Sequence, residues 1–234
     1  MILKSDKVYK QTKQIILGDS KMAPLYEPLA NWIDSTFNVK TVNIVHDYIN
    51  GNKRPRLNII FEFEKEKLKF NGKERFGYDS SKQKKIAGEF ERLMKEYFDS
   101  KRPGLLNFFK RENHESIWKN LWVIFSSFEP VAKSEVNEKL PESRIKQLKN
   151  DIANPDIWEI SRAFSGVTFF VHTDEQLKKY EKGTEKEVWR NQYFQLLKEY
   201  DEYNYFNLKT FNIYLDSKEN FDNNYESSWF YYYR

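Results

Sequence analysis

The chain of 234 residues contains no cysteine, which excludes disulfides, thiolate metal ligands and cysteine nucleophiles. It has no apolar run near the roughly 18–20 residues of a membrane-spanning helix. Its first residues lack the apolar core and small-residue cleavage site of a secretory signal. We therefore expect a soluble, cytoplasmic protein that makes no membrane contact.

Familiar catalytic motifs are missing as well. The sequence has no Gly-x-Ser-x-Gly turn, no Gly-x-Gly-x-x-Gly loop and no phosphate loop ending in Gly-Lys-Ser/Thr. Ser165-Gly166 lacks the preceding glycine of a strained nucleophile turn. We expect no cofactor and no bound metal, and we favour a chain that is not an enzyme.

Charge is balanced, and apolar side chains are plentiful. The 39 Lys and Arg residues are mixed with 35 Asp and Glu residues, for a net charge of +4. A nucleic-acid footprint would need basic residues concentrated on one face, so we do not expect nucleic acid as a partner. Aromatic residues make up 17% of the chain, enough for a substantial core in one sizeable domain or in two small ones packed together.

The middle of the chain, Ile117–Phe128, holds five consecutive apolar residues from Leu121 to Phe125. So short a run, rich in β-branched residues, predicts a strand covered on both faces. Before it, Leu25, Leu29, Ile33 and Phe37 predict a helix that starts near Pro24. Two alternating runs, Val42–Tyr48 and Leu57–Phe63, flank Asn50-Gly51 and predict a hairpin.

Further elements follow from similar patterns. In the first half, Glu64–Lys67 is expected to extend the second strand as a charged edge, Leu68–Gly72 to form a third short strand, and a helix to begin at Asp79 or Ser80. In the second half we expect helices over 131–140 and from Pro141, a turn of helix over Ile157–Phe164, a buried strand Val167–Val171, helices after Thr173 and after Gly183-Thr184, and strands at Leu208–Leu215 and Trp229–Tyr233.

These elements predict an α+β fold with antiparallel or mixed sheets covered by amphipathic helices. Residues 1–22 are expected to be a tail or an edge strand, 23–130 a first α+β unit and 131–234 a second one. In this interpretation the helix that starts near Pro24 corresponds to the 143–164 region, and the helix that starts at Asp79 or Ser80 corresponds to 184–203. The segment Val42–Tyr48 corresponds to Val167–His172, and Ile117–Phe128 corresponds to Leu208–Leu215. The alternative is that ordinary elements fall in this order by chance.

Two of the three histidines stand beside carboxylates at the predicted strand ends. His46-Asp47 and His172-Thr173-Asp174 would form a metal or acid–base site if the strand ends met, because a carboxylate orients an imidazole. The alternative is that they are ordinary polar residues where strands leave the core. His114, among charged neighbours, is expected to be a solvated loop residue.

Glu62, Glu64 and Glu66 alternate with Phe63, Lys65 and Lys67. The acidic pair with a following lysine that metal nucleases use does not fit this spacing, so we expect a solvated edge. A separate set of aromatic residues suggests a stacking platform for single-stranded nucleic acid or sugar, with strand packing as the alternative; it comprises Tyr203, Tyr205, Phe206, Tyr231, Tyr232 and Tyr233.

The segment from Glu187 to Tyr225 resembles the C-terminal half of YezG-type immunity proteins, bacterial antitoxins of polymorphic toxin systems. The matching residues are the strand-like Leu208-Lys209-Thr210-Phe211-Asn212-Ile213-Tyr214-Leu215-Asp216-Ser217, followed by Phe221 and Tyr225. Leu25–Asp34 resembles the opening helix of the family. The tryptophan expected before the strand is absent, and Glu219-Asn220 replaces the turn glycine.

The resemblance implies a stoichiometric protein binder without catalysis, in which the matched strand is followed by an aromatic strand. It identifies no binding residue. The leading hypothesis is therefore a protein-interaction module of the immunity-inhibitor kind. The alternatives are an enzyme built on His46, Asp47, His172 and Asp174, and an aromatic platform for nucleic acid or sugar.

Overall fold

The computed structural model describes residues 2–49, 54–73, 77–100 and 120–234. The chain divides between Glu129 and Pro130 into two compact units, and each unit is described by itself. Asn50-Gly51, His114 and the first residues of Ile117–Phe128 lie outside the described residues. Within the described ranges, no helix combines the length and apolar character required to cross a bilayer.

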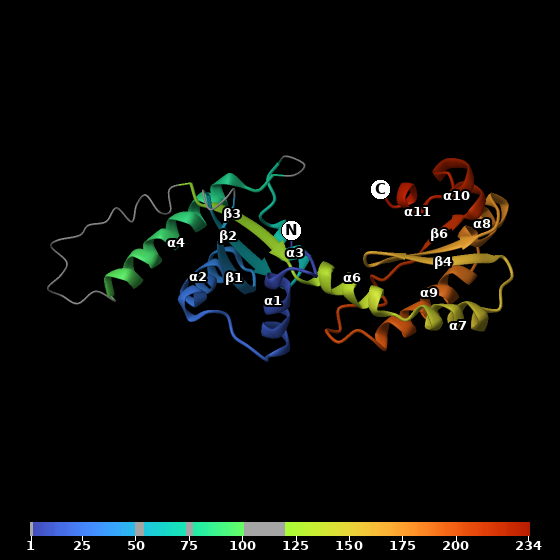
Figure 1. The fold of residues 1–234 in the computed structure, drawn as a ribbon, viewed down its shortest axis with the longest axis horizontal. Coiled ribbons are helices and arrows are strands. Elements are labelled where there is room, and N and C mark those ends of the chain that lie inside the picture. Colours follow the sequence, from blue (N-terminus) through green and yellow to red (C-terminus); the bar gives the residue numbers. More distant parts are fainter. Residues whose placement is uncertain (1, 50–53, 74–76, 101–119) are drawn as a thin grey trace. The chain divides into compact units, whose positions relative to one another are not determined.

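The first unit contains one mixed sheet and the helices around it (Figure 1). Its strands are ordered β1-β2-β3, with β1 and β2 antiparallel and β2 and β3 parallel. In chain order the elements are α1 (Lys7–Leu17), η1 (Pro24–Tyr26), α2 (Glu27–Phe37), β1 (Thr41–Ile49), β2 (Arg54–Phe61), α3 (Glu64–Leu68), α4 (Ser80–Ser100) and β3 (Trp122–Ser127).

One face of this sheet forms the core with α2 and α4. Ile33 of α2 and Phe90 of α4 are fully or almost fully buried against Leu57, Ile59 and Phe125. Strand β3 is buried on both faces, as the sequence predicts, with Phe125 0% and Ser126 2% exposed. Burial of large side chains such as Phe90 and Phe125 contributes about 1.5–3 kcal/mol each, so the packing of α2 and α4 on one face of the sheet holds the first unit together.

The opposite face of the first sheet is covered by α1. Tyr9 is buried and stacks on Phe128, with ring centroids 5.0 Å apart. Thr12 is 0% exposed and accepts a hydrogen bond from the amide of Asn43 at 3.1 Å. The expectation that residues 1–22 are a tail or an edge strand is therefore wrong. The helix escaped notice because its buried face carries tyrosine and threonine instead of an aliphatic stripe.

The second unit has the same strand order and the same strand directions. Its sheet is β4-β5-β6, with β4 and β5 antiparallel and β5 and β6 parallel. The elements are α6 (Glu129–Lys139), α7 (Glu142–Ile152), β4 (Ile157–Ala163), β5 (Gly166–Val171), α8 (Asp174–Lys182), α9 (Glu185–Lys198), β6 (Tyr214–Ser217), α10 (Lys218–Tyr225) and α11 (Trp229–Tyr232).

Helices cover both faces of the second sheet. Figure 1 shows α7 and α9 on one side and α10 with α11 on the other. The first side is the larger core, where Phe169 of β5 meets Trp189 and Tyr193 of α9. On the second side, Trp158 of β4 and Phe170 of β5 pack on aromatic rings of the C-terminal helices.

Four local predictions are wrong for identifiable reasons. The predicted helical turn Ile157–Phe164 is strand β4 up to Ala163, because a bulge between Ile157 and Glu159 turns Ile157 and Ile160 to the same face and mimics helical spacing. Glu64–Lys67 begins helix α3, and the Leu68–Gly72 strand is a single bridge from Asn71 to Tyr78. Trp229–Tyr232 is helical, since residues 229, 232 and 233 share a helical face.

The predicted match between the halves needs one correction. Within the sheet order, β4 holds the place of β1 and β5 that of β2, so Val42–Tyr48 does not correspond to Val167–His172. The error follows from reading β4 as helix, which removed one strand from the second half. The predicted correspondence of Ile117–Phe128 with Leu208–Leu215 matches β3 with β6 in the sheet order. Strand β6 is shorter than predicted and shifted along the chain, at Tyr214–Ser217.

A buried asparagine joins three elements of the second unit. Asn137 of α6 is 1% exposed, and its amide donates to the carbonyls of Phe164 and Gly166, both at 2.9 Å. Its carbonyl accepts the hydroxyl of Tyr193 at 2.6 Å. The side chain thus fixes α6 against the β4–β5 turn and α9 at once.

We expect Asn137→Ala to lower the free energy of unfolding by about 2–3 kcal/mol, because two partly buried carbonyls and the buried Tyr193 hydroxyl lose their partners. Urea denaturation followed by circular dichroism measures this change. Asn191→Ala, at an exposed position of α9, is the matched control and should change stability by less than about 0.5 kcal/mol. Equal losses in the two variants would contradict the role of Asn137.

Candidate functional site

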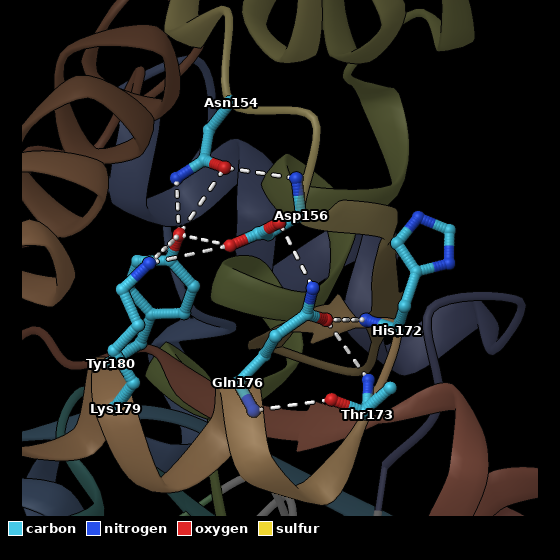
Figure 2. Close-up of polar contacts among 7 residues, drawn as sticks. All are labelled: Asn154, Asp156, His172, Thr173, Gln176, Lys179 and Tyr180. Carbon is cyan, nitrogen blue, oxygen red and sulfur yellow. Dashed lines mark hydrogen bonds and ion pairs between the residues drawn. The ribbon is translucent and has the colours of Figure 1, made fainter.

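The residues around His172 form a polar cluster at one end of the second sheet (Figure 2). Strand β5 ends at Val171, and Thr173 is the N-cap of α8. The start of β4 comes alongside, because the α7 C-cap Ala153 adopts a left-handed conformation and Asn154 accepts the backbone N–H of Asp156 at 2.9 Å. Two segments distant in the sequence thereby meet.

Gln176 connects these segments. Its carbonyl oxygen accepts the backbone N–H groups of His172 and Thr173 at 2.9 and 3.0 Å, which completes the capping box of α8. Its amide nitrogen donates to Asp156 at 2.9 Å. One side chain therefore caps a helix and holds the carboxylate of the neighbouring strand.

The second oxygen of Asp156 accepts the hydroxyl of Tyr180 at 2.6 Å and lies 3.5 Å from the ammonium of Lys179. The Tyr180 hydroxyl, followed by the Lys179 charge, lowers the pKa of Asp156. The hydroxyl also accepts the amide of Asn154 at 3.0 Å. The pKa of Lys179 is raised, first by its hydrogen bond with Tyr180 and then by Asp156.

These shifts determine what the cluster can do chemically. A carboxylate with a lowered pKa that already accepts three donors is a poor general base, and a lysine with a raised pKa stays protonated and is a poor nucleophile. The Tyr180 ring is buried and lies 4.9 Å from the ring of Trp189. In Figure 2 the His172 imidazole points away from the other side chains, so the cluster is best explained as a set of structural contacts that joins β4 to α8.

A second polar contact closes the same end of the sheet. Ser217 ends β6, and its hydroxyl donates to the carboxylate of Asp174 at the start of α8. Glu219 accepts the backbone N–H of Asp174 at 3.0 Å, and its own N–H donates to the carbonyl of His172 at 3.2 Å. The parallel edge strand is thus joined to the helix that follows the central strand.

The first unit carries the same contacts at the same place. The hydroxyl of Ser127, the last residue of β3, donates to the carboxylate of Glu64 at the start of α3. Glu129 accepts the backbone N–H of Glu64 at 3.3 Å, and its N–H donates to the carbonyl of Glu62 at 2.9 Å. Serine, helix-start carboxylate and a glutamate two residues after the serine occur in both units. We call this set the serine–carboxylate clasp.

The sequence candidates His46 and Asp47 do not form a pair. Neighbours on a strand point to opposite faces, and the His46 ring lies against Tyr48 and Phe90 on the core side. Burial lowers the pKa of His46 and favours the neutral imidazole. Asp47 binds Arg56 of β2 through both oxygens, at 2.8 and 2.5 Å.

The other two candidates, His172 and Asp174, lie in the second unit, and Asp174 is engaged by Ser217. His46 and Asp47 therefore lie in the first unit and His172 and Asp174 in the second, and a joint site of all four residues stays a prediction. Within the described ranges, no group of three or more histidine and acidic side chains is arranged to hold a metal ion.

The three alternating glutamates Glu62, Glu64 and Glu66 have structural contacts, although they do not lie on a strand edge as expected. Glu66 is buried and accepts the N–H groups of Lys40 and Phe63 at 2.8 and 3.2 Å. Glu62 pairs with the ammonium of Lys40 at 2.9 Å, and Glu64 pairs with Lys67 at 2.9 Å. All three hold the turn between β2 and α3.

The predicted aromatic platform is largely buried. Tyr205 and Phe206 are 9% and 6% exposed, while Tyr232 and Tyr233 are half-buried and donate their hydroxyls to Asp216 and Ser161. Of the predicted set, Tyr231 is exposed, at 47%. The neighbouring Phe230 is 71% exposed and was not recognised, since its sequence neighbours are all aromatic and nothing distinguishes the outward residue until the helix is known.

Grooves in the described parts of the chain include one in each unit. One, of about 490 Å³, lies in the first unit and is lined by Ala23, Pro24, Leu25, Pro28, Leu93 and Tyr97. The other, of about 270 Å³, lies between α7 and α9, and its rim carries the ion pair of Arg144 with Glu199. Neither groove is lined by His46, His172 or a residue of the serine–carboxylate clasps.

No family model, curated protein or solved structure matches this chain. The site is therefore interpreted from its own geometry.

We expect Tyr180→Phe to lower the free energy of unfolding at neutral pH by about 1–2 kcal/mol, because the buried hydroxyl connects Asn154 with Asp156. Since the folded-state pKa of Asp156 is lowered, its contribution is present above the unfolded pKa of about 3.9 and is lost as the pH falls through the folded pKa. The variant should show a weaker loss of stability on acidification. Urea titrations at several pH values measure both effects, with the exposed Tyr214→Phe as control; an unchanged acid dependence would contradict the assignment.

The two serine–carboxylate clasps can be compared directly. We expect Ser127→Ala to destabilise the protein by about 1 kcal/mol, because a hydrogen bond to a carboxylate is lost. Ser217→Ala should cost about 1–2 kcal/mol, because Ser217 also caps α10 by accepting the backbone N–H of Asn220 at 2.8 Å. The losses should add in the double variant, since the two serines share no partner. Thermal unfolding of the three variants tests this, and Ser143→Ala, exposed on α7, serves as the control.

Proposed function

We propose that this chain is a protein-binding module without catalytic activity. The observation that carries the proposal is the outward face of α11. Its inward residues, Trp229, Tyr232 and Tyr233, contact the second sheet and its neighbours, whereas Phe230 and Tyr231 project from the surface. Exposed aromatic residues on an anchored element are the usual anchors of protein interfaces.

The anchoring of α11 matters for binding. A helix of four residues is not stable alone, but here the hydroxyls of Tyr232 and Tyr233 bind Asp216 and Ser161 at 2.6 and 2.7 Å. Phe230 and Tyr231 are therefore held in place before a partner arrives, which lowers the entropy cost of association. The guanidinium of Arg234 lies 5.8 Å from the Phe230 ring, so a partner pocket with an acidic rim would suit this surface.

The contacts of the carboxylate side chains support the same proposal. The carboxylates of both clasps, of Asp156 and of Asp47 are engaged by serine, tyrosine, lysine or arginine side chains of their own unit. Among these groups, no carboxylate is left without a structural partner and available to act on a substrate. The resemblance to immunity proteins makes a bacterial toxin the first partner to examine, although Phe221 and Tyr225 lie in helix α10 instead of the aromatic strand that the resemblance implies.

We also propose that the two units are copies of one ancestral α+β unit. Three features support this: the common strand order, a bulge after the first residue of β1 and of β4, and the serine–carboxylate clasp at the same strand ends. Strand order alone could recur by chance, but the clasp requires matched side chains at several positions. The exposed aromatic helix α11 would then be a feature of the second copy.

The test of the proposed function is Phe230→Ala combined with Tyr231→Ala. We expect at least about a 30-fold loss of affinity for the partner, the size of a 2 kcal/mol hot spot, with unchanged unfolding free energy because both side chains are exposed. Partner retention is measured by quantitative affinity capture and, for a toxin, by survival of cells that produce both proteins.

Val188→Ala, at an exposed position of α9, is the matched control for this experiment. Equal retention by the double variant and the control would contradict the assignment of α11 as the binding surface. Growth inhibition that the wild-type chain does not relieve would exclude that toxin as the partner.

A further inference from the structure

The hinge before α11 has an unusual backbone. Glu226 and Ser227, which connect α10 with the N-cap Ser228, have φ angles of 53° and 54°. This left-handed region is unfavourable for residues other than glycine, because Cβ approaches the carbonyl oxygen. Among the described residues, it is the one place where two consecutive non-glycine residues adopt it.

The C-cap of α10, where the backbone N–H of Ser227 donates to the carbonyl of Phe221 at 3.2 Å, and the docked position of α11 together hold this strain in place. Trp229 stacks parallel to Trp158 at 5.9 Å and lies 5.3 Å from Phe170 and 4.3 Å from Phe221. Tyr232 donates to Asp216, and Tyr233 donates to Ser161. Trp158, Phe170, Phe221, Asp216 and Ser161 together form what we call the α11 seat. A strained two-residue hinge between two docked elements is the arrangement that favours exchange of the terminal element.

We propose that α11 exchanges between two copies of this chain, so that the seat of each copy holds the C-terminal residues 228–234 of the other. Every contact of the seat is remade with the identical residues of the second copy. The hinge, no longer required to fold back, leaves the left-handed region. Strain release therefore favours the exchanged dimer. The covalent hinge favours the monomer, because it keeps α11 at a high effective concentration near the seat of its own chain.

The occupant is another copy because the seat is already shaped to residues 228–234. Two hydroxyls and a tryptophan ring must arrive at Asp216, Ser161 and Trp158 at once, and a second copy supplies all three in the right order. Phe230 and Tyr231 are not used in the seat, so the exchange does not rest on the protein-binding proposal and either can fail alone.

The experiment is sedimentation velocity of the full chain from about 10 μM to about 1 mM, a range that extends up to the millimolar effective concentration of a short tether. We expect the dimer fraction to rise with concentration. Glu226→Gly with Ser227→Gly removes both Cβ atoms and so relieves the backbone strain of the monomer. The dissociation constant of the dimer should rise at least about tenfold. A chain that is monomeric throughout overturns the proposal, as does a dimer that the hinge variant leaves unchanged.

A mixing experiment separates exchange from ordinary association. Trp229→Ala with Tyr232→Ala disables the exchanged segment, and Trp158→Ala with Asp216→Ala disables the seat. Neither variant should dimerise alone, but the mixture should form a heterodimer with one exchanged segment. Because the chain lacks cysteine, Lys146→Cys on α7 provides one labelling position for energy transfer. Dimers of either variant alone, or no heterodimer from variants whose circular dichroism matches wild type, would overturn the proposal.

Discussion

A three-stranded sheet excludes water from its side chains only when another layer lies over each of its two faces, and this constraint shapes both units. In each, one face packs on two amphipathic helices, α2 and α4 or α7 and α9. The other face must be covered from elsewhere. The first unit uses α1, which precedes the sheet in sequence, and the second uses α10 and α11, which follow it. The extra layer is thus taken from opposite ends of the chain.

The two coverings differ in chemistry. Beneath α1 the contact includes polar groups, with Thr12 bound to Asn43 and the Asn58 carbonyl bound to the Ser126 hydroxyl at 3.0 Å. Beneath α11 it is a set of aromatic rings with hydroxyl groups at the periphery. A polar, fully satisfied contact specifies one geometry, whereas the contact beneath α11 depends mainly on burial of aromatic rings. This contrast is consistent with a stable first covering and an exchangeable second one.

The sequence predicted the α+β class, the β1–β2 strands, β3, β5 and most of the helices, because their apolar periods are regular. It failed where a local irregularity altered the period. The bulge at Ile157 and Glu159 made β4 look helical, and α1 buries Tyr9 and Thr12 instead of aliphatic residues. The clasps were not foreseen, since Ser127 and Glu64 are common residues whose meeting depends on the parallel pairing of distant strands. The start of a helix after Thr173 was predicted, because a capping residue is a local signal.

The parallel pairing also sets an order of events during synthesis. Strand β2 ends at Phe61, and its parallel neighbour β3 begins only at Trp122, whereas the antiparallel partner β1 is adjacent in the chain. In the second unit the corresponding gap, from Val171 to Tyr214, is shorter. Because contacts between distant residues form slowly, the nascent first unit must wait as a two-stranded hairpin with one side of β2 unpaired. Until β3 emerges from the ribosome, the open edge of β2 is therefore a site at which the nascent chain can misassociate.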